Sequence, residues 1–330
     1  MRIVRRALSE ISSTDLEVID NLISRNQGLI FHEAGFNRIV ADYFGSNLEY
    51  FFLIKNDLRT AGICPAHIIK QGLVARIYSN PTHCEMPYGG WVLDQDYSPR
   101  DLIAKMPLKI NEILIYWSSF FNINISLGSG LAITEHQTAI IDLDRGEETI
   151  WQDVIDPRKK NKVRKAWKNG ISFREGEEKD LPDFCSLLQK TRTAANLRLR
   201  ELEFYLAVFR LLQPQGKVRL FLAELGKELV AAVLIIGNAN CMHYWQGTVN
   251  KEAPNLGQSE LLQWEAIKWS QRRGARFYDM CVVDKEHLPH IASFKCGFAR
   301  EVTPFYSLER KPFLYRFLNR INRMQGNYGH

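Results

Sequence analysis

The feature of this chain that most constrains its fold is a strand–turn–strand pattern that occurs twice. Residues 51–58 (FFLIKNDL) and 221–228 (FLAELGKE) each place an apolar strand before a tight turn and the start of a second strand. In both halves a helical pattern precedes this segment, and further strand and helix patterns follow it in the same order. A repeated order of elements indicates a structural duplication, so we predict two similar α/β domains.

The composition agrees with two packed domains. The chain has 330 residues, of which 45% are hydrophobic and 24% are charged, which suffices for sizeable cores and excludes a disordered chain. The polar stretch 144–148 (DRGEE) follows a predicted strand and is the natural boundary. We therefore predict a first domain over 1–150, a second domain over 151–307 and a tail over 308–330. Within the first domain we expect a long amphipathic helix over 110–121.

Several classes of protein are excluded at this stage. No apolar run approaches the roughly 18 residues that a transmembrane helix needs. The basic N-terminus is followed by polar residues and not by the apolar core of a signal peptide, so we expect a cytoplasmic protein. The 6 cysteines include no close pair of the kind that binds zinc, and we expect free thiols and no metal.

Short motifs occur in a fixed order along both halves. In the first half they are 31–36 (FHEAGF), 62–65 (GICP) and 87–90 (PYGG); in the second half they are 156–170 (DPRKKNKVRKAWKNG), 244–247 (YWQG), 261–267 (LLQWEAI), 278–279 (YD) and 293–298 (SFKCGF). In this order and spacing, the sequence resembles the FemABX-like acyltransferases over nearly its whole length. These proteins consist of two tandem acetyltransferase-type (GNAT) domains. The resemblance implies an α/β (α+β) fold with mixed sheets flanked by helices.

The resemblance also implies a function. Such enzymes move an acyl or aminoacyl group from acyl-CoA or aminoacyl-tRNA to an amino group of a bacterial cell-envelope precursor, either an amino sugar or a peptidoglycan peptide. The expected partners are this precursor and, with the second donor, tRNA. The donor acts as a co-substrate, and no permanently bound cofactor is expected. The alternative is a non-catalytic GNAT-fold module that binds an anionic glycolipid or a nucleic acid.

Three residues of the second domain are predicted to be catalytic. Lys295 matches a lysine that the resemblance places in the active site, where an ammonium group can stabilise the oxyanion of acyl transfer; the alternative is a surface lysine without a role. Asp279 ends a predicted strand, and it either accepts a proton from the attacking amine or bonds to the backbone. Tyr244 either reaches the reacting centre or is a buried, hydrogen-bonded tyrosine. His243 alternates with Tyr244, so these two side chains face opposite sides.

A basic window over 158–168 holds seven basic residues and no acid. On a helix, Lys160, Arg164 and Lys168 recur at four-residue spacing and form one cationic stripe that would attract a phosphate group. A solvated helix face is the alternative. Trp167, inside the window, is expected to face the core.

Two further residues are candidates for binding the substrate or its phosphate. Trp245 lies beside Tyr244 in the predicted cleft. Ser259 lies at the start of the following helix, where GNAT domains that use acyl-CoA usually hold the diphosphate in a glycine-rich turn. The segment 254–259 contains one glycine, and Ser259 is equally well explained as a helix N-cap.

The C-terminal tail is expected to form a basic amphipathic helix. Phe313 and Phe317 belong to its apolar face, while Arg316, Arg320 and Arg323 supply positive charge. Such a helix either packs on the domains or makes a weak, peripheral contact with the anionic inner face of the membrane.

Overall fold

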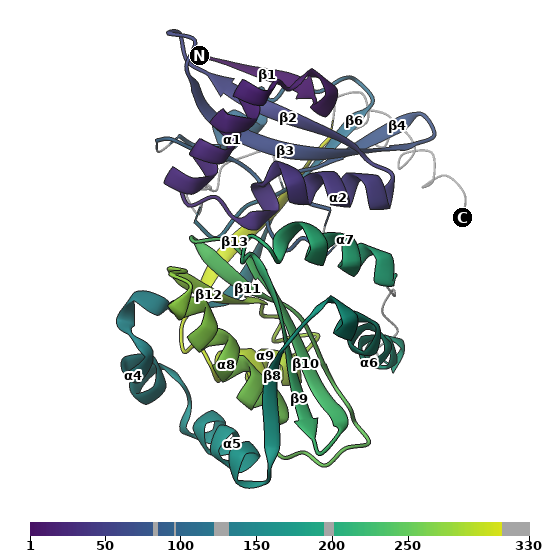
Figure 1. The fold of residues 1–330 in the computed structure, drawn as a ribbon. Coiled ribbons are helices and arrows are strands. Elements are labelled where there is room, and N and C mark those ends of the chain that lie inside the picture. The colour runs from purple at the N-terminus through teal and green to yellow at the C-terminus, as the bar shows by residue number, and fades with distance from the viewer. Residues whose placement is uncertain (82–84, 96, 122–131, 195–200, 312–330) are drawn as a thin grey trace, which may run out of the picture. The chain divides into compact units, whose positions relative to one another are not determined.

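The computed structural model describes residues 1–81, 85–95, 97–121, 132–194 and 201–311 (Figure 1). The chain forms two compact units. The first comprises residues 1–136 and the chain from Pro304 onward, and the second comprises Gln137–Thr303. Each unit is a mixed sheet with helices on both faces, as the next paragraphs show.

The first unit contains a sheet in the order β1-β2-β3-β4-β6-β13, with β5 paired to β3. Its β4–β6 pair is parallel, while the pairs β1–β2, β2–β3, β3–β4, β3–β5 and β6–β13 are antiparallel. The elements are β1 (Arg2–Ala7), α1 (Ser13–Arg25), α2 (Ala34–Phe44), β2 (Asn47–Ile54), β3 (Thr60–Gln71), β4 (Val74–Tyr78), β5 (Val92–Leu93), α3 (Pro99–Lys105), β6 (Glu112–Trp117) and β13 (Val302–Arg310).

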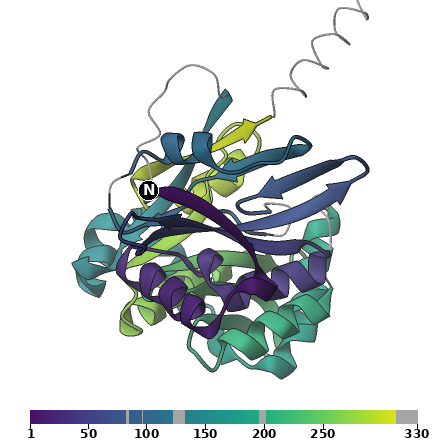
Figure 2. The same cartoon turned by 90° about the horizontal axis from the view of Figure 1, so that it is seen from above.

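Side chains that alternate along β2 supply both faces of this sheet. Tyr50 and Phe52 pack in one core with residues of α1 and α2. Phe51 and Leu53 point the other way and pack in a second core with residues of α3. This alternation is the two-residue period of a strand that is buried on both faces. Helices α1 and α2 lie on the same side of the sheet in both views (Figures 1 and 2).

The second unit contains a sheet in the order β7-β12-β11-β10-β9-β8. Its β11–β12 pair is parallel, and the other neighbours are antiparallel. The elements are β7 (Ala132–Asp142), α4 (Glu147–Thr149), α5 (Pro157–Lys168), β8 (Ile171–Gly176), α6 (Leu181–Ala194), α7 (Leu202–Leu212), β9 (Val218–Leu225), β10 (Glu228–Gly237), β11 (Cys241–Val249), α8 (Gln258–Arg272), β12 (Phe277–Val282) and α9 (Pro289–Cys296).

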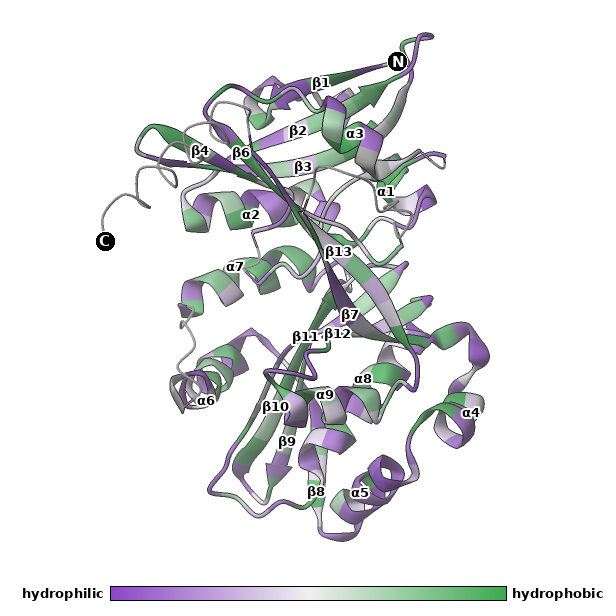
Figure 3. Ribbon diagram, turned by 180° about the vertical axis from the view of Figure 1, so that it is seen from behind, coloured by the Kyte–Doolittle hydropathy of each residue, from purple (hydrophilic) through white to green (hydrophobic). Residues whose placement is uncertain are grey.

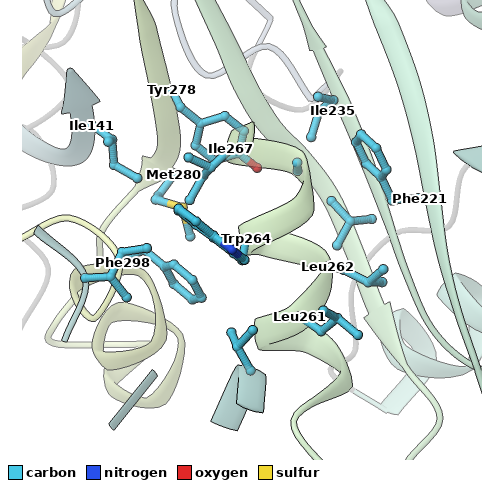
Figure 4. Close-up of a cluster of buried hydrophobic side chains, with 14 of the residues drawn as sticks. Ile141, Phe221, Ile235, Leu261, Leu262, Trp264, Ile267, Tyr278, Met280 and Phe298 are labelled. Carbon is cyan, nitrogen blue, oxygen red and sulfur yellow. The ribbon is translucent and has the colours of Figure 1, made fainter. Parts of the chain in front are cut away.

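The main core of the second unit lies between its sheet and α8. Figure 4 shows Trp264 of α8 among Phe298, Met280 and Tyr278, with Phe221 of β9 on the other side of the helix. Helices α6 and α7 contact strands β11 and β9, respectively. In Figure 3, β10 is coloured largely as hydrophobic and α5 largely as hydrophilic, as expected for a central strand and a peripheral helix.

The two units repeat one topology. Each has an outer strand, two helices, an antiparallel three-stranded meander, a helix, and a strand that pairs in parallel with the last meander strand. The predicted fold class, two tandem GNAT-like domains with mixed sheets flanked by helices, is confirmed. One strand that pairs in each unit comes from the other half of the chain: β7 follows β6 but pairs with β12, whereas β13 follows β12 but pairs with β6.

This exchange of strands explains where the observed units differ from the predicted domains. The predicted boundary lay at residue 150, but the observed one lies at 136/137, because the end of β7 joins the second sheet. The second domain was predicted to end at residue 307. The chain instead returns to the first unit at Pro304, because β13 pairs with β6.

Two further expectations concern single segments. The helix expected over 110–121 is wrong, because Glu112–Trp117 forms strand β6. The expected tail begins inside β13, which runs to Arg310, and the remainder, residues 312–330, lies outside the described residues. Within the described part of the chain, no helix combines the length and apolar character needed to cross a membrane.

Candidate active site

The candidate site is built on a fork between two parallel strands of the second unit. Strands β11 and β12 pair over three residues only, ending with His243 opposite Asp279. Beyond this pair each strand changes course: the register of β11 on β10 shifts at Tyr244, and the register of β12 on β7 shifts after Asp279. Bulges of this kind re-aim side chains beside active sites, and ligands of α/β sheets bind at the carboxyl ends of parallel strands.

A buried, hydrogen-bonded carboxylate lies at the branch point of the fork. Asp279 is fully buried. Its Oδ2 accepts a hydrogen bond from His243 Nδ1 at 2.8 Å, and its Oδ1 accepts from the Cys281 backbone N–H at 2.9 Å and from the Thr138 hydroxyl. Burial alone would raise the pKa of Asp279, but His243, Thr138 and the Cys281 amide together lower it below its ordinary value. The carboxylate is therefore charged, and His243 must carry a proton on Nδ1.

The backbone next to this carboxylate is strained. Cys281 has φ +58°, a left-handed conformation that non-glycine residues rarely adopt. Its N–H points at Asp279 Oδ1, so the unusual backbone supplies one of the hydrogen bonds that hold the carboxylate. Burial raises the pKa of the Cys281 thiol well above its ordinary value, and this thiol stays protonated at neutral pH. Strain of this kind gathers at functional sites.

The other two predicted catalytic residues lie at the same fork. Lys295 on α9 donates from Nζ to the Val282 carbonyl at 2.7 Å, and burial lowers the pKa of its ammonium, opposed by Cys281 and Asp279. Tyr244 is partly buried, and burial raises its pKa to about 12. Lys295 and Asp279 thus both hydrogen-bond to the backbone of the segment Cys281–Val282, whereas Tyr244 lies beside Tyr278 on the face that carries α8.

A tyrosine–glutamine contact supports the α8 side of the fork. The Tyr278 hydroxyl donates to Gln263 Oε1 at 2.8 Å, and both residues are fully buried. Burial raises the pKa of Tyr278 well above its ordinary value, with the neighbouring Tyr244 acting in the same direction. Two neutral phenols thus lie on the face of the sheet that carries α8, whereas the charged Asp279 and His243 pair with Thr138 of β7.

The residues predicted to bind phosphate do not form one exposed stripe. Lys160 is buried, with 9% of its surface exposed, and its Nζ donates to the Gln152 carbonyl at 3.0 Å. Arg164 donates to Asn161 at 3.1 Å and lies over the Trp151 ring. Lys168 is exposed. The stripe is broken because the inner face of α5, with Lys160 in it, packs on the unit.

Trp167 also departs from expectation, because its side chain is half exposed and does not face the core. The core-facing positions of α5 are Val163 and Ala166. A tryptophan inside a basic helix therefore faces outward here, beside the exposed Lys168.

The start of α8 is covered by α5. Gly257, with φ +93°, is the N-cap of α8, and a Cβ there would lie 2.2 Å from the Lys162 carbonyl oxygen. Lys159 and Lys162 donate to Glu260 at 3.0 and 3.1 Å. Burial raises the pKa of Glu260, but these two lysines lower it below its ordinary value, so a charged carboxylate occupies the first turn. Ser259 lies inside this turn and is not the N-cap, which corrects that alternative.

Trp245 lies on the opposite side of β11 from Tyr244. It is buried, and its ring packs on Phe204 and Tyr205 of α7, with ring centroids 6.0 and 5.8 Å away. The structure therefore places Trp245 in the packing between β11 and α7 and not beside Lys295.

Sequence reasoning missed two residues of the cluster, His243 as an active-site group and Thr138. The signal for His243 was its alternation with Tyr244, combined with a parallel register that puts it opposite Asp279. Among the described residues, His243, Asp279 and Cys281 also carry possible metal-ligand atoms within 4.8 Å of one another. In the structure their polar atoms are joined by the hydrogen bonds given above.

Comparisons with known proteins concern the fold of the chain. Residues 157–287 match the family model of the acetyltransferase (GNAT) domain. Among solved structures, the chain is similar to FemX, with 14% identity, 93% of this chain and 97% of that chain covered, and a TM-score of 0.69. No sequence of a curated protein gives a significant match.

Two further solved structures share the fold. The C-terminal domain of a putative lysylphosphatidylglycerol synthetase from Agrobacterium fabrum is 12% identical, with 90% of this chain and 92% of that chain covered and a TM-score of 0.57. L-PGS from Bacillus licheniformis is 12% identical, with 92% and 93% covered and a TM-score of 0.54. Residues 157–287 of the second unit thus match the acetyltransferase (GNAT) domain, and the chain shares its fold with FemX.

Proposed function

We propose that the second unit transfers an acyl or aminoacyl group to an amino group of a cell-envelope precursor at the fork between β11 and β12. The observation that carries this proposal is the buried, charged Asp279 bonded to His243 where the two parallel strands separate. A fully desolvated ion at this position costs free energy, so a role beyond packing is expected of it.

His243 is the proposed general base. Because Asp279 holds the proton of the imidazole on Nδ1, the neutral ring has its lone pair on Nε2 and accepts a proton there. An amine attacks only when it is deprotonated, and a histidine with this orientation can take its proton. Asp279 acts through His243 and is a positioning residue.

Lys295 is the proposed oxyanion stabiliser. Its ammonium has three protons, and one of them is donated to the Val282 carbonyl. As the amine nitrogen bonds to the donor carbonyl carbon, negative charge develops on the carbonyl oxygen and attracts the ammonium. The carbon–sulfur bond of an acyl-CoA or the carbon–oxygen bond of an aminoacyl ester then breaks, and the proton taken by His243 is returned to the leaving group.

The start of α8 favours an aminoacyl donor over acyl-CoA in the usual GNAT pose. A diphosphate bound there would meet the Glu260 carboxylate and the α5 backbone at Gly257. A helix N-terminus attracts anions, but a carboxylate in its first turn already occupies that favourable position. The name of one structural neighbour, a lysylphosphatidylglycerol synthetase, also describes an aminoacyl product.

The test compares donors directly. The purified full chain is incubated with labelled acetyl-CoA or with aminoacyl-tRNA, together with amino-sugar and peptidoglycan-peptide precursors, and the labelled product is identified by mass spectrometry. We expect transfer from aminoacyl-tRNA to an amino group. Transfer from acetyl-CoA alone would overturn the choice of donor, and no transfer from either donor would overturn the proposed function.

A matched pair of variants tests the base. His243→Gln should lower turnover by about 10²–10⁴. His287→Gln is the control, because His287 is exposed and its imidazole bonds to Asp284 near the surface. Equal turnover of the two variants would remove His243 from the mechanism.

A further inference from the structure

Two large apolar side chains of the first unit are strongly exposed. Leu73, in the turn between β3 and β4, is 92% exposed, and Ile110, in the loop before β6, is 69% exposed. An isolated apolar side chain on a surface needs no explanation, but two on neighbouring tips indicate a candidate contact surface.

Hydrogen bonds join these two tips. The Asn111 side chain donates to the Leu73 carbonyl at 3.0 Å, and the Ala75 backbone N–H donates to the Asn111 carbonyl at 3.0 Å. The parallel pairing of β4 and β6 begins at Ala75 and Glu112, directly after the tips. Leu73 and Ile110 therefore project from the same end of one sheet.

Positive charge surrounds the tips. Lys70, Lys105 and Lys109 are exposed, and none of them forms an ion pair with a residue that the structure describes. The nearby acids are occupied, because Glu49 and Glu112 both bind Arg5.

A cavity of about 300 Å³ lies beside the tips, and its lining includes Lys70, Lys109, Asn47 and Asn111. The two carboxylates in the lining, Glu49 and Glu112, are the ones paired with Arg5, which also lines the cavity. Two ammonium groups and two amides are donors that suit phosphate oxygens. This volume is at the small end of ligand pockets, enough for a headgroup and not for a whole lipid.

The last described strand also ends at this end of the sheet. Strand β13 runs antiparallel to β6 and brings Arg310 opposite Leu114, close to the start of β6. The described chain ends at Lys311, directly after this strand. The sequence of residues 312–330 contains the basic residues named above for the tail.

We propose that this end of the first unit, named the docking edge and made of Lys70, Leu73, Lys105, Lys109 and Ile110, binds the surface of an anionic lipid bilayer. Apolar tips enter the boundary between headgroups and acyl chains while lysines bind lipid phosphates. A stable protein partner would need a contact of about 1,000 Å² or more, whereas two apolar tips ringed by lysines suit a headgroup layer better. This inference goes beyond the proposed function and does not depend on acyl transfer.

The experiment measures partition of the full chain onto vesicles of phosphatidylglycerol and phosphatidylcholine by sedimentation. Wild type should bind these vesicles at least tenfold better than pure phosphatidylcholine vesicles. Leu73→Ser with Ile110→Ser should weaken binding at least tenfold, and Lys70→Gln with Lys109→Gln should weaken it similarly and reduce its salt dependence. These exposed substitutions should leave the thermal unfolding temperature nearly unchanged.

A control variant lies on the same sheet. Leu58 is 75% exposed in the turn between β2 and β3, at the opposite end of β3 from Leu73, so Leu58→Ser should bind as wild type does. Binding that survives loss of Leu73 and Ile110 but is lost with Arg316→Ser, Arg320→Ser and Arg323→Ser would assign the membrane contact to the tail and overturn the docking edge. Absence of binding by wild type, or equal binding to both kinds of vesicle, would overturn it too.

Discussion

The tautomer of His243 offers the sharpest test of the candidate site, through the substitution Asp279→Asn. Two donors, the Thr138 hydroxyl and the Cys281 N–H, converge on Oδ1, while His243 Nδ1 donates to Oδ2. The single oxygen of an asparagine amide should stay where two donors meet, so its NH₂ group faces His243. The imidazole must then accept on Nδ1 and carry its proton on Nε2, and it can no longer act as a base there.

The Asp279→Asn variant should lose both turnover and stability, by amounts that differ in origin. A positioned general base contributes about 10²–10⁴ in rate, so turnover of Asp279→Asn should fall by that factor, equivalent to about 3–5 kcal/mol in the barrier. The free energy of unfolding should fall by about 1.5–3 kcal/mol, because hydrogen bonds to a charged group become neutral ones. Thr138→Val is the control: it removes one hydrogen bond from the same carboxylate but leaves the proton of His243 on Nδ1.

Three measurements together test whether His243 is the general base. Imidazole ¹⁵N chemical shifts at neutral pH report which ring nitrogen of His243 carries the proton, single-turnover transfer gives the rate, and urea unfolding gives the stability. We expect Thr138→Val to lose about 1–2 kcal/mol of stability and to keep turnover within tenfold of wild type. A wild-type proton on Nε2, or turnover of Asp279→Asn equal to that of Thr138→Val, would refute the assignment of His243 as the base.

Three further predictions test other parts of the second unit. The two lysines bound to Glu260 hold the pKa of its carboxyl below the ordinary 4.5. The charged carboxylate therefore stabilises the fold above about pH 4.5, and this stabilisation is lost as the pH falls through the lowered pKa. When the free energy of unfolding in urea is plotted against pH, Glu260→Gln should flatten the acid limb. Burial lowers the pKa of Lys295 below 10.5, so the free energy of unfolding should rise with pH from the lowered value up to about 10.5. Lys295→Met should abolish this rise and lower turnover at least about tenfold. Unchanged turnover would contradict the role of Lys295 at the Val282 carbonyl. Arg164→Glu with Lys168→Glu should weaken donor binding at low salt and match wild type at high salt, whereas equal affinity at every salt concentration would identify these residues as a solvated helix face.

The repeated topology could be predicted from the sequence because its strongest signals are local. Each hairpin is encoded by two apolar strands and a short turn, and Gly226 adopts φ +65° in the turn between β9 and β10. The order of helices and hairpins then repeats along the chain without any knowledge of long-range pairing. The exchange of β7 and β13 is long-range and leaves no trace in the local pattern, which is why the predicted boundaries were displaced.

Strand β6 shows how local reasoning fails. Ile113, Leu114 and Tyr116 are all buried, so consecutive residues of β6 are apolar on both faces. A continuous apolar run has no period that separates a helix from a doubly buried strand. This segment forms a strand because it pairs in parallel with β4 and antiparallel with β13, and both partners are distant in sequence.

The candidate site was predictable only in part for the same reason. Lys295 and Asp279 were found through motifs, and the structure places both at the fork. His243 was identified as facing the side opposite to Tyr244, but its pairing with Asp279 depends on the register between two strands that α8 separates in the chain. The inward direction of Lys160 depends on how α5 packs, which helical spacing alone does not contain.

The forks of the two units differ in charge, which supports placing the proposed chemistry in the second unit. In the first unit β4 and β6 pair in parallel up to Tyr78 and Ile115, the counterpart of the pair that ends with His243 and Asp279. There Ser79 continues the ladder: its hydroxyl donates to the Trp117 carbonyl at 3.0 Å and accepts from the Trp117 N–H at 2.8 Å.

The neighbouring loop closes the fork of the first unit further. The Trp91 N–H donates to the Tyr116 hydroxyl at 3.1 Å, and a Cβ at Gly89 would lie 2.4 Å from the Ser79 carbonyl oxygen. Neutral side chains and close-packed backbone thus fill the position that holds a charged Asp279 in the second unit. A duplicated domain needs one reacting centre, and the first unit keeps the scaffold without this charge. The buried carboxylate and the strained Cys281 both cost free energy, and both occur in the unit where the proposed chemistry uses them.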